Sequence, residues 1–253
     1  SGHRRMHKGL SLLDTPTRTR TSPLPVHEGT PSGSAMNTLA GNSKLLIKLA
    51  VVAVIVIVVV LVGVGVYNHR SAAAQDQLSA AMQTYAAPIR SAENPVPATT
   101  RSFGSVDERA KAANAEFKAI ADTYGMTDAG RNALYLEGLT ALQIGQNATA
   151  EELLKKSASS WNSDISNLAG LALAGLYHST GRTAQAIAEY NRIIAKPSNL
   201  VPVGLAKLQL AELYEADGKQ ADAKKIYAEI KDKDPKSAAA ELATEKLNGP
   251  VAR

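Results

Sequence analysis

One histidine in the C-terminal part of the chain has a side chain that could take part in proton transfer. His178 could act as a general base, but that role needs an acidic or nucleophilic neighbour, and the sequence around it supplies none. A histidine on a helix surface, or one lining a groove, is therefore the favoured interpretation. The other four histidines lie at or before residue 69, so we expect no metal site.

The other candidate for direct ligand contact is Trp161, which follows a short run of serine and alanine. Its indole could stack on a ligand, or it could fill the gap between adjacent helix pairs, and the second interpretation is favoured. Phosphate-binding glycine loops, dinucleotide fingerprints, zinc-protease helices and nucleophile elbows are all absent from the sequence. We expect no catalytic residue, no cofactor and no enzymatic activity.

Composition excludes further classes. With no cysteine among its 253 residues, the chain cannot form disulfides, zinc–cysteine sites or thiol nucleophiles. Residues 1–70 hold 8 Lys/Arg against 2 Asp/Glu, whereas the rest holds 20 against 21, so the net charge of +5 belongs to the N-terminal segment. Aromatic residues make up only 4%. Nucleic acid is therefore not an expected partner.

The first element that would position these residues is a candidate membrane span. The 19 residues from Leu49 to Tyr67 carry no charge, and 14 of them are Val, Ile or Leu. A helix of this length covers ~28 Å at ~1.5 Å per residue, close to the ~30 Å hydrocarbon core of a bilayer. We expect residues 49–67 to contact membrane lipid as a single helix.

The flanking charges give this span a direction. Lys44 and Lys48 precede it, while Arg70 follows and no further Lys or Arg occurs until Arg90. The positive-inside rule then places the N-terminus in the cytoplasm and residues 71–253 outside, which is the periplasm of a two-membrane bacterium. A cleaved signal peptide ending near Ala72–Ala74 is the alternative; the apolar run exceeds the usual ~7–15 residues, so an uncleaved anchor is favoured.

The sequence predicts four segments. Residues 1–43, rich in Thr, Ser, Pro and Gly, are expected to be disordered, with Met36 a sensible start site. Residues 44–70 form the anchor. Residues 71–105 form a juxtamembrane helix and a proline-containing linker. Residues 106–247 form the repeat domain, opened by a half-repeat helix over 106–124.

A period of 36–37 residues runs through the last segment. Gly145, Gly181 and Gly218 are separated by 36 and 37 residues, and each is followed five residues later by alanine. A bulky residue follows each glycine by nine, and a small one precedes it by seven. Each unit therefore reads as a helix, a turn with glycine in the left-handed conformation, and a second helix.

These units are similar to tetratricopeptide (TPR) repeats, so the fold class is all-α: one transmembrane helix followed by a TPR-like solenoid of three to four helix pairs. The third unit carries the pattern most completely, in Leu210, Ala211, Tyr214, Gly218, Ala223, Tyr227 and Pro235. The second matches almost as well, and the first has Ala141 and Leu154 at the two aromatic positions.

The whole layout resembles the ancillary SecYEG translocon subunit (YfgM-like) family of bacterial inner-membrane proteins. Phe117 and Tyr124, followed by Ala133 and Gly138, look like that family's entry into its first repeat. The resemblance implies a periplasmic TPR domain working near the Sec translocon. Its implied partners are translocon subunits, periplasmic chaperones or secreted clients.

Binding residues are expected on the concave side, lined by the first helix of each unit. The alternative is that several of the leucines only pack helix against helix. The main candidates are Asn132, Tyr135, Leu139, Gln143, Leu171, His178, Ser179, Leu208, Glu212 and Glu215, accompanied by Leu142, Leu168, Gly175 and Leu205. This mixed surface without a Lys/Arg clamp suits an extended or helical protein segment.

Two functions from different classes follow. The leading one is an interaction module that assists secreted proteins at the translocon. The alternative is a scaffold for envelope biogenesis or cell division, which homo-oligomerisation through residues 71–104 would favour. An enzymatic function ranks third. A hydrolase or transferase activity that is lost when His178 is substituted would support it.

Overall fold

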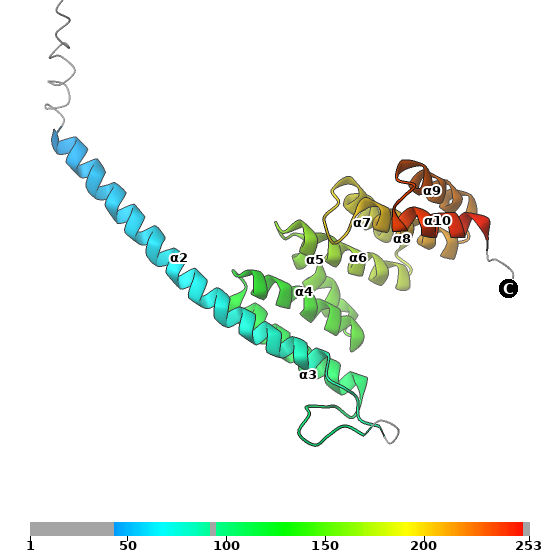
Figure 1. The fold of residues 1–253 in the computed structure, drawn as a ribbon, viewed down its shortest axis with the longest axis horizontal. Coiled ribbons are helices and arrows are strands. Elements are labelled where there is room, and N and C mark those ends of the chain that lie inside the picture. Colours follow the sequence, from blue (N-terminus) through cyan, green and yellow to red (C-terminus); the bar gives the residue numbers. More distant parts are fainter. Residues whose placement is uncertain (1–42, 92–94, 250–253) are drawn as a thin grey trace, which may run out of the picture. The chain divides into compact units, whose positions relative to one another are not determined.

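The computed structural model describes residues 43–91 and 95–249, and every regular element within them is helical. The expected disorder of residues 1–43 falls, except for Ser43, outside the described residues. The helices, labelled as in Figure 1, are α2 (Ser43–Tyr85), α3 (Val106–Tyr124), α4 (Asp128–Gln143), α5 (Asn147–Ala158), α6 (Ser163–Ser179), α7 (Thr183–Ala195), α8 (Val203–Ala216), α9 (Gln220–Lys233) and α10 (Ala238–Asn248).

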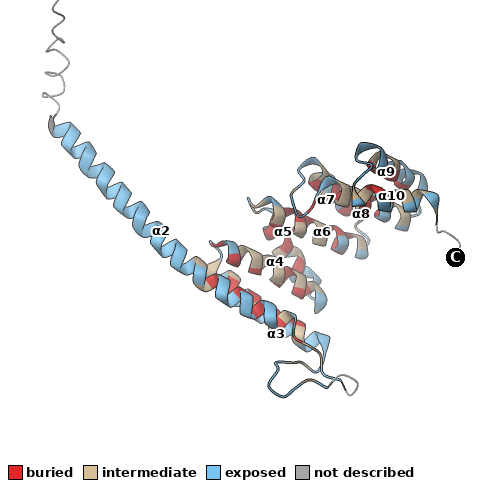
Figure 2. Ribbon diagram, viewed as in Figure 1, coloured by how far each residue is buried: buried red, intermediate tan, exposed pale blue. Residues whose placement is uncertain are grey.

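By its contacts the chain divides into two units, Ser1–Val58 and Val59–Arg253. In the first unit, residues 44–58 are helical and every side chain is exposed. The second unit contains the remainder of α2 and all the other described helices. Exposure along α2 continues until Ser71, after which buried positions begin (Figure 2).

The helix α2 is uninterrupted over 43 residues although its composition changes along its length. Among the described residues it is the one helix long and apolar enough, by length and composition, to cross a membrane. After the apolar run, Ala74, Leu78 and Ala81 recur at helical spacing and are buried. They pack with Phe117 and other residues of α3 and α4.

This packing changes the interpretation of the helix over 106–124. The sequence predicts a half-repeat there, but α3 is paired with the last turns of α2 to give a complete helix pair. The two helices run antiparallel, because Arg109 near the start of α3 donates to Ala87 O and Tyr124 at its end accepts from Gln77. The connection between them is closed by a bridge of Ile89 to Phe103.

The all-α, repeat-like fold class is confirmed. Successive helices from α3 to α10 pack in chain order, α3 on α4, α4 on α5, and so on (Figure 1). Gly145, Gly181 and Gly218 each turn the chain between paired helices with φ of 75–76°. The residue after each glycine donates its N–H to the carbonyl five residues back, as in Gln146 to Ala141, which closes the helix end.

Small and bulky residues fill the places that the period assigns to them. Gly138, Ala174 and Ala211 are buried on the first helices, and each lets the second helix approach closely. For Gly138 there is no room for a methyl group, since an added Cβ would lie 2.9 Å from Leu154 Cγ. Tyr190 and Tyr227 take the place of Leu154 in the later units, and all three are buried.

Candidate binding site on the first helices

The candidate residues on the first helices divide into a packing group and a solvent-facing group. Tyr135, Leu139 and Leu171 are half-buried and pack against the core that joins α4 to α8. Leu208 is buried in the core shared by α8, α9 and α10. For these four residues the packing alternative accounts for the side chain.

The polar candidates near the C-terminal end line two neighbouring clefts. The first, of about 230 Å³, lies between α6 and α8 and is bordered by Gly175, His178, Gln209 and Glu212. The second, of about 420 Å³, lies between α8 and α10, and Glu212 borders it as well. We call the combined surface the acidic trough. Its polar side chains are His178, Gln209, Glu212, Glu215, Glu245 and Lys246, and its other lining residues include Tyr190, Leu208, Leu213 and Leu242.

A buried hydroxyl fixes one carboxylate of the acidic trough. The ring of Tyr227 is fully buried, and its Oη donates to Glu215 Oε2 at 3.1 Å. Burial, together with this hydrogen bond to an anion, raises the pKa of Tyr227, so the phenol stays protonated and remains a donor at neutral pH. Glu215 is therefore held in one orientation from beneath the trough.

The charge of the trough is predominantly negative. Lys246 Nζ lies 3.2 Å from Glu215 Oε2 and 3.9 Å from Glu212 Oε1, so one ammonium group is shared by two carboxylates. Glu245 adds a further exposed carboxylate on α10. An exposed ion pair of this kind is worth only ~0–1 kcal/mol, so a cationic ligand can compete with Lys246.

His178 has an acidic neighbour that its sequence surroundings do not predict. Asp217, which follows α8, places Oδ1 3.9 Å from His178 Nδ1, and that nitrogen is buried without a hydrogen-bond partner. This separation is too long for a hydrogen bond. Of the residues that line the cleft with His178, none is Ser, Thr or Lys. The pair supports the interpretation of His178 as a groove-lining histidine.

Three further candidates, all of them polar, also lie outside the trough. Gln143 donates to the hydroxyl of Tyr85 at 2.8 Å, which ties α4 to α2. Ser179 donates to Leu176 O within its own helix. Asn132 lies near the start of α4 and borders neither cleft. These residues share the first-helix positions of the repeat but do not form part of one site with Glu212.

Glu245 and Lys246 are site residues that the sequence analysis missed. They lie on α10, which occupies the first-helix place of a further unit. A signal was present in the repeated Leu-Ala pair, because Leu242-Ala243 follows Leu173-Ala174 and Leu210-Ala211. The interval shortens from 37 to 32 residues at this last pair, which hides it from a search at a fixed period.

Nothing in the described part of the chain offers a metal centre, since no three His, Asp or Glu side chains are arranged to hold an ion. Comparisons with protein-family models, with curated proteins and with solved structures give no match for the chain. The geometry of the trough and of α2 is therefore the basis on which a function can be argued.

Proposed function

We propose that this protein is a membrane-anchored, non-catalytic binding module that holds a basic segment of a partner protein in the acidic trough. The observation that carries the proposal is the line of carboxylates, Glu212, Glu215 and Glu245, along clefts between first helices. Extended or helical segments bind such grooves through a few side-chain anchors. A partner with Lys or Arg at those anchors would match the charge.

The apolar stretch of α2 supports the anchor part of the proposal. Its hydropathy and length suit a single span, with Lys44 and Lys48 on the cytoplasmic side. The trough would then be displayed in the periplasm. Tethering raises the effective concentration of the module near other membrane proteins, so weak contacts in the trough suffice.

The resemblance to YfgM-like proteins supplies the finer form of the proposal. In that form the partner is a Sec translocon subunit, a periplasmic chaperone, or a secreted client leaving the translocon. The second candidate, a scaffold for envelope biogenesis or division, uses the same trough with a different class of partner. The two differ in which protein is captured.

Site-specific photo-crosslinking in intact membranes tests the proposal. A photoreactive amino acid replaces Gln209 in the full chain, and a matched variant carries it at Lys224, which is exposed on α9 outside both clefts. We expect a crosslinked partner from position 209 and none from 224. Charge-neutral variants Glu212→Gln and Glu245→Gln should weaken the crosslink several-fold.

The identity of the crosslinked protein separates the candidates. A translocon subunit, chaperone or secreted client supports the leading function, and a division or cell-wall protein supports the scaffold. Equal crosslinking from both positions, or none from either, contradicts binding in the trough.

A further inference from the structure

Three successive turns between helix pairs each expose one large apolar side chain. Met126 lies between α3 and α4, Trp161 between α5 and α6, and Leu200 between α7 and α8, with exposed fractions of 84%, 77% and 60%. Of the large hydrophobic side chains described after residue 85, these are the three most exposed. The expected role of Trp161 as a filler between helix pairs is therefore wrong.

The three turns adjoin one another. One cleft of about 440 Å³ is bordered by Arg70, Met126, Arg131 and Lys156. A second, of about 330 Å³, is bordered by Trp161 together with the same Met126, Arg131 and Lys156. The backbone N–H of Leu200 donates to Asp164, which is in the first turn of α6 just after Trp161. We call Met126, Trp161 and Leu200 the apolar edge.

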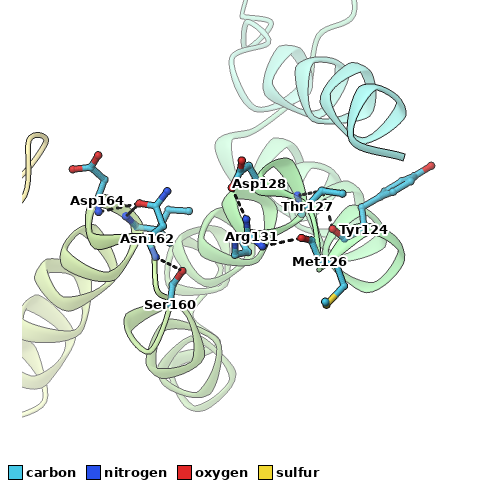
Figure 3. Close-up of polar contacts among 10 residues, drawn as sticks. Tyr124, Met126, Thr127, Asp128, Arg131, Ser160, Asn162 and Asp164 are labelled. Carbon is cyan, nitrogen blue, oxygen red and sulfur yellow. Dashed lines mark hydrogen bonds and ion pairs between the residues drawn. The ribbon is translucent and has the colours of Figure 1, made fainter. Parts of the chain in front are cut away.

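The exposure does not come from loosely held loops. Figure 3 shows Thr127 and Asn162, which cap the helices that follow the first two turns. Arg131 donates a hydrogen bond to Met126 O at 2.8 Å and forms an ion pair with Asp128. The guanidinium of Arg131 also lies 4.9 Å from the centre of the Trp161 ring. The indole is thus supported on one face by a cation.

The first of these turns lies beside the end of the apolar run of α2. Arg70 donates to Thr123 O and lies 5.6 Å from the centre of the Tyr124 ring. It follows Tyr67, the last residue of the run, by three positions, or ~4.5 Å along a helix. The antiparallel course of α3 therefore brings the turn after Tyr124 back to the level where a membrane span would end.

We propose that the apolar edge rests in the headgroup layer of the same bilayer that α2 crosses. Tryptophan and tyrosine favour this layer, because an apolar ring and a polar atom are both accommodated there. Lys156, in the last turn of α5, borders both clefts, and Lys196 follows α7, which would place cations near anionic headgroups. The inference depends on the proposed membrane anchor and adds a second contact with the lipid.

The sequence contains one tryptophan, so intrinsic fluorescence reports on Trp161 alone. The full chain is reconstituted into phosphatidylcholine vesicles, with and without phosphatidylglycerol, and floated on a density gradient. Lipids brominated near the glycerol end of the acyl chain then serve as quenchers. We expect a blue shift and the loss of about half the intensity, since interfacial groups lie ~5–10 Å into the headgroup boundary.

A double variant, Trp161→Phe with Ala148→Trp, is the matched control. Ala148 is exposed at the start of α5, at the opposite end of that helix from Trp161, and should show no quenching. If the chain floats with the vesicles but the fluorescence of Trp161 is not quenched, the proposed lipid contact of the apolar edge is overturned and the anchor is not. A protein would then be the expected partner of the apolar edge. A chain that does not float overturns the anchor as well.

Discussion

Glu137 is a buried carboxylic acid at a position where the later units have Leu173 and Leu210. Burial raises its pKa, against the opposing influence of Lys118 and Lys156. A carboxyl whose pKa is raised by folding favours the folded state while it is protonated, and that contribution is lost as the pH rises through the folded pKa. We therefore expect this residue to make the α4–α5 helix pair less stable at neutral pH than in acid.

We predict that Glu137→Gln raises the melting temperature of the full chain in detergent more at pH 7 than at pH 4. The amide cannot ionise, so the cost of burying a charge disappears where the wild-type side chain would be ionised. Circular dichroism at the two pH values measures the difference. Glu152→Gln, on the exposed face of α5, is the control and should give the same small change at both. Equal gains for Glu137→Gln at both pH values would contradict the account.

At the scale of single residues, the sequence predicts which positions are small, bulky or glycine, because these follow from the repeat. It does not predict which exposed side chains share a site. The repeat frame predicts Glu212 as a candidate. It does not predict Asp217 beside His178 or Lys246 beside Glu215, because these contacts depend on helix ends that the frame does not locate. The exposure of Trp161 is not predicted, because this residue lies in the turn between α5 and α6, where the repeat pattern assigns no packing position.

Among the elements, the junction of α3 and α4 depends on one glycine. An added Cβ at Gly130 would lie 1.9 Å from Tyr124 O, a backbone atom that cannot move aside cheaply. Thr127 caps α4 by accepting from the N–H of the same glycine. The close approach therefore sets the angle at which α4 leaves the end of α3, and with it the position of Met126.

We predict that Gly130→Ala destabilises the chain by ~1–3 kcal/mol, the usual cost of overpacking. Gly175→Ala is the matched control, since a Cβ there meets nothing within 4 Å, and its helix interior should gain ~0.5–1 kcal/mol. Thermal unfolding of the two variants measures both effects. A Gly130→Ala protein as stable as the wild type would mean that the α3–α4 junction is not closely packed.

The sequence does not predict how two helices, α3 and α10, pack against their partners. The sequence predicts α3 as a half-repeat because Ala113 and Phe117 precede Ala150 and Leu154 by 37 residues each. Its partner in α2 lies before a connection, from Tyr85 to Val106, that is far longer than the turns between the later helices. The pairing of α2 with α3 depends on Ala74, Leu78 and Ala81, whose spacing fits any amphipathic helix. The final helix α10 falls at a shortened interval, so a fixed period does not indicate its place beside α8.

For the whole molecule, we expect the local free energy of unfolding to differ from one part of the helix array to another, because each helix packs mainly on its neighbours in the chain. Removing residues from Ala238 onward would uncover Leu208 and Tyr227. We predict a loss of hydrogen-exchange protection confined to α8 and α9, with α4 and α5 unchanged. Leu242→Ser, at an exposed position of α10, should leave all protection in place. Uniform loss along the chain would contradict this prediction.

The distribution of charge along the sequence is a second property of the whole molecule. The basic excess before residue 71 and the near-neutral remainder match a chain divided by a membrane, and the negative trough lies in the neutral part. The central claim is that a single uncleaved span in α2 carries the repeat array on the outer side of the membrane.

Protease treatment of sealed spheroplasts tests that claim most directly, with the chain detected by tags at both ends. We expect a full-length chain that stays with carbonate-washed membranes and loses its C-terminal tag to external protease, while the N-terminal tag is protected. A shorter soluble species beginning near Gln75 would show a cleaved signal peptide instead. Protection of the C-terminal tag in sealed cells would place the array on the other side, and either result would contradict the account.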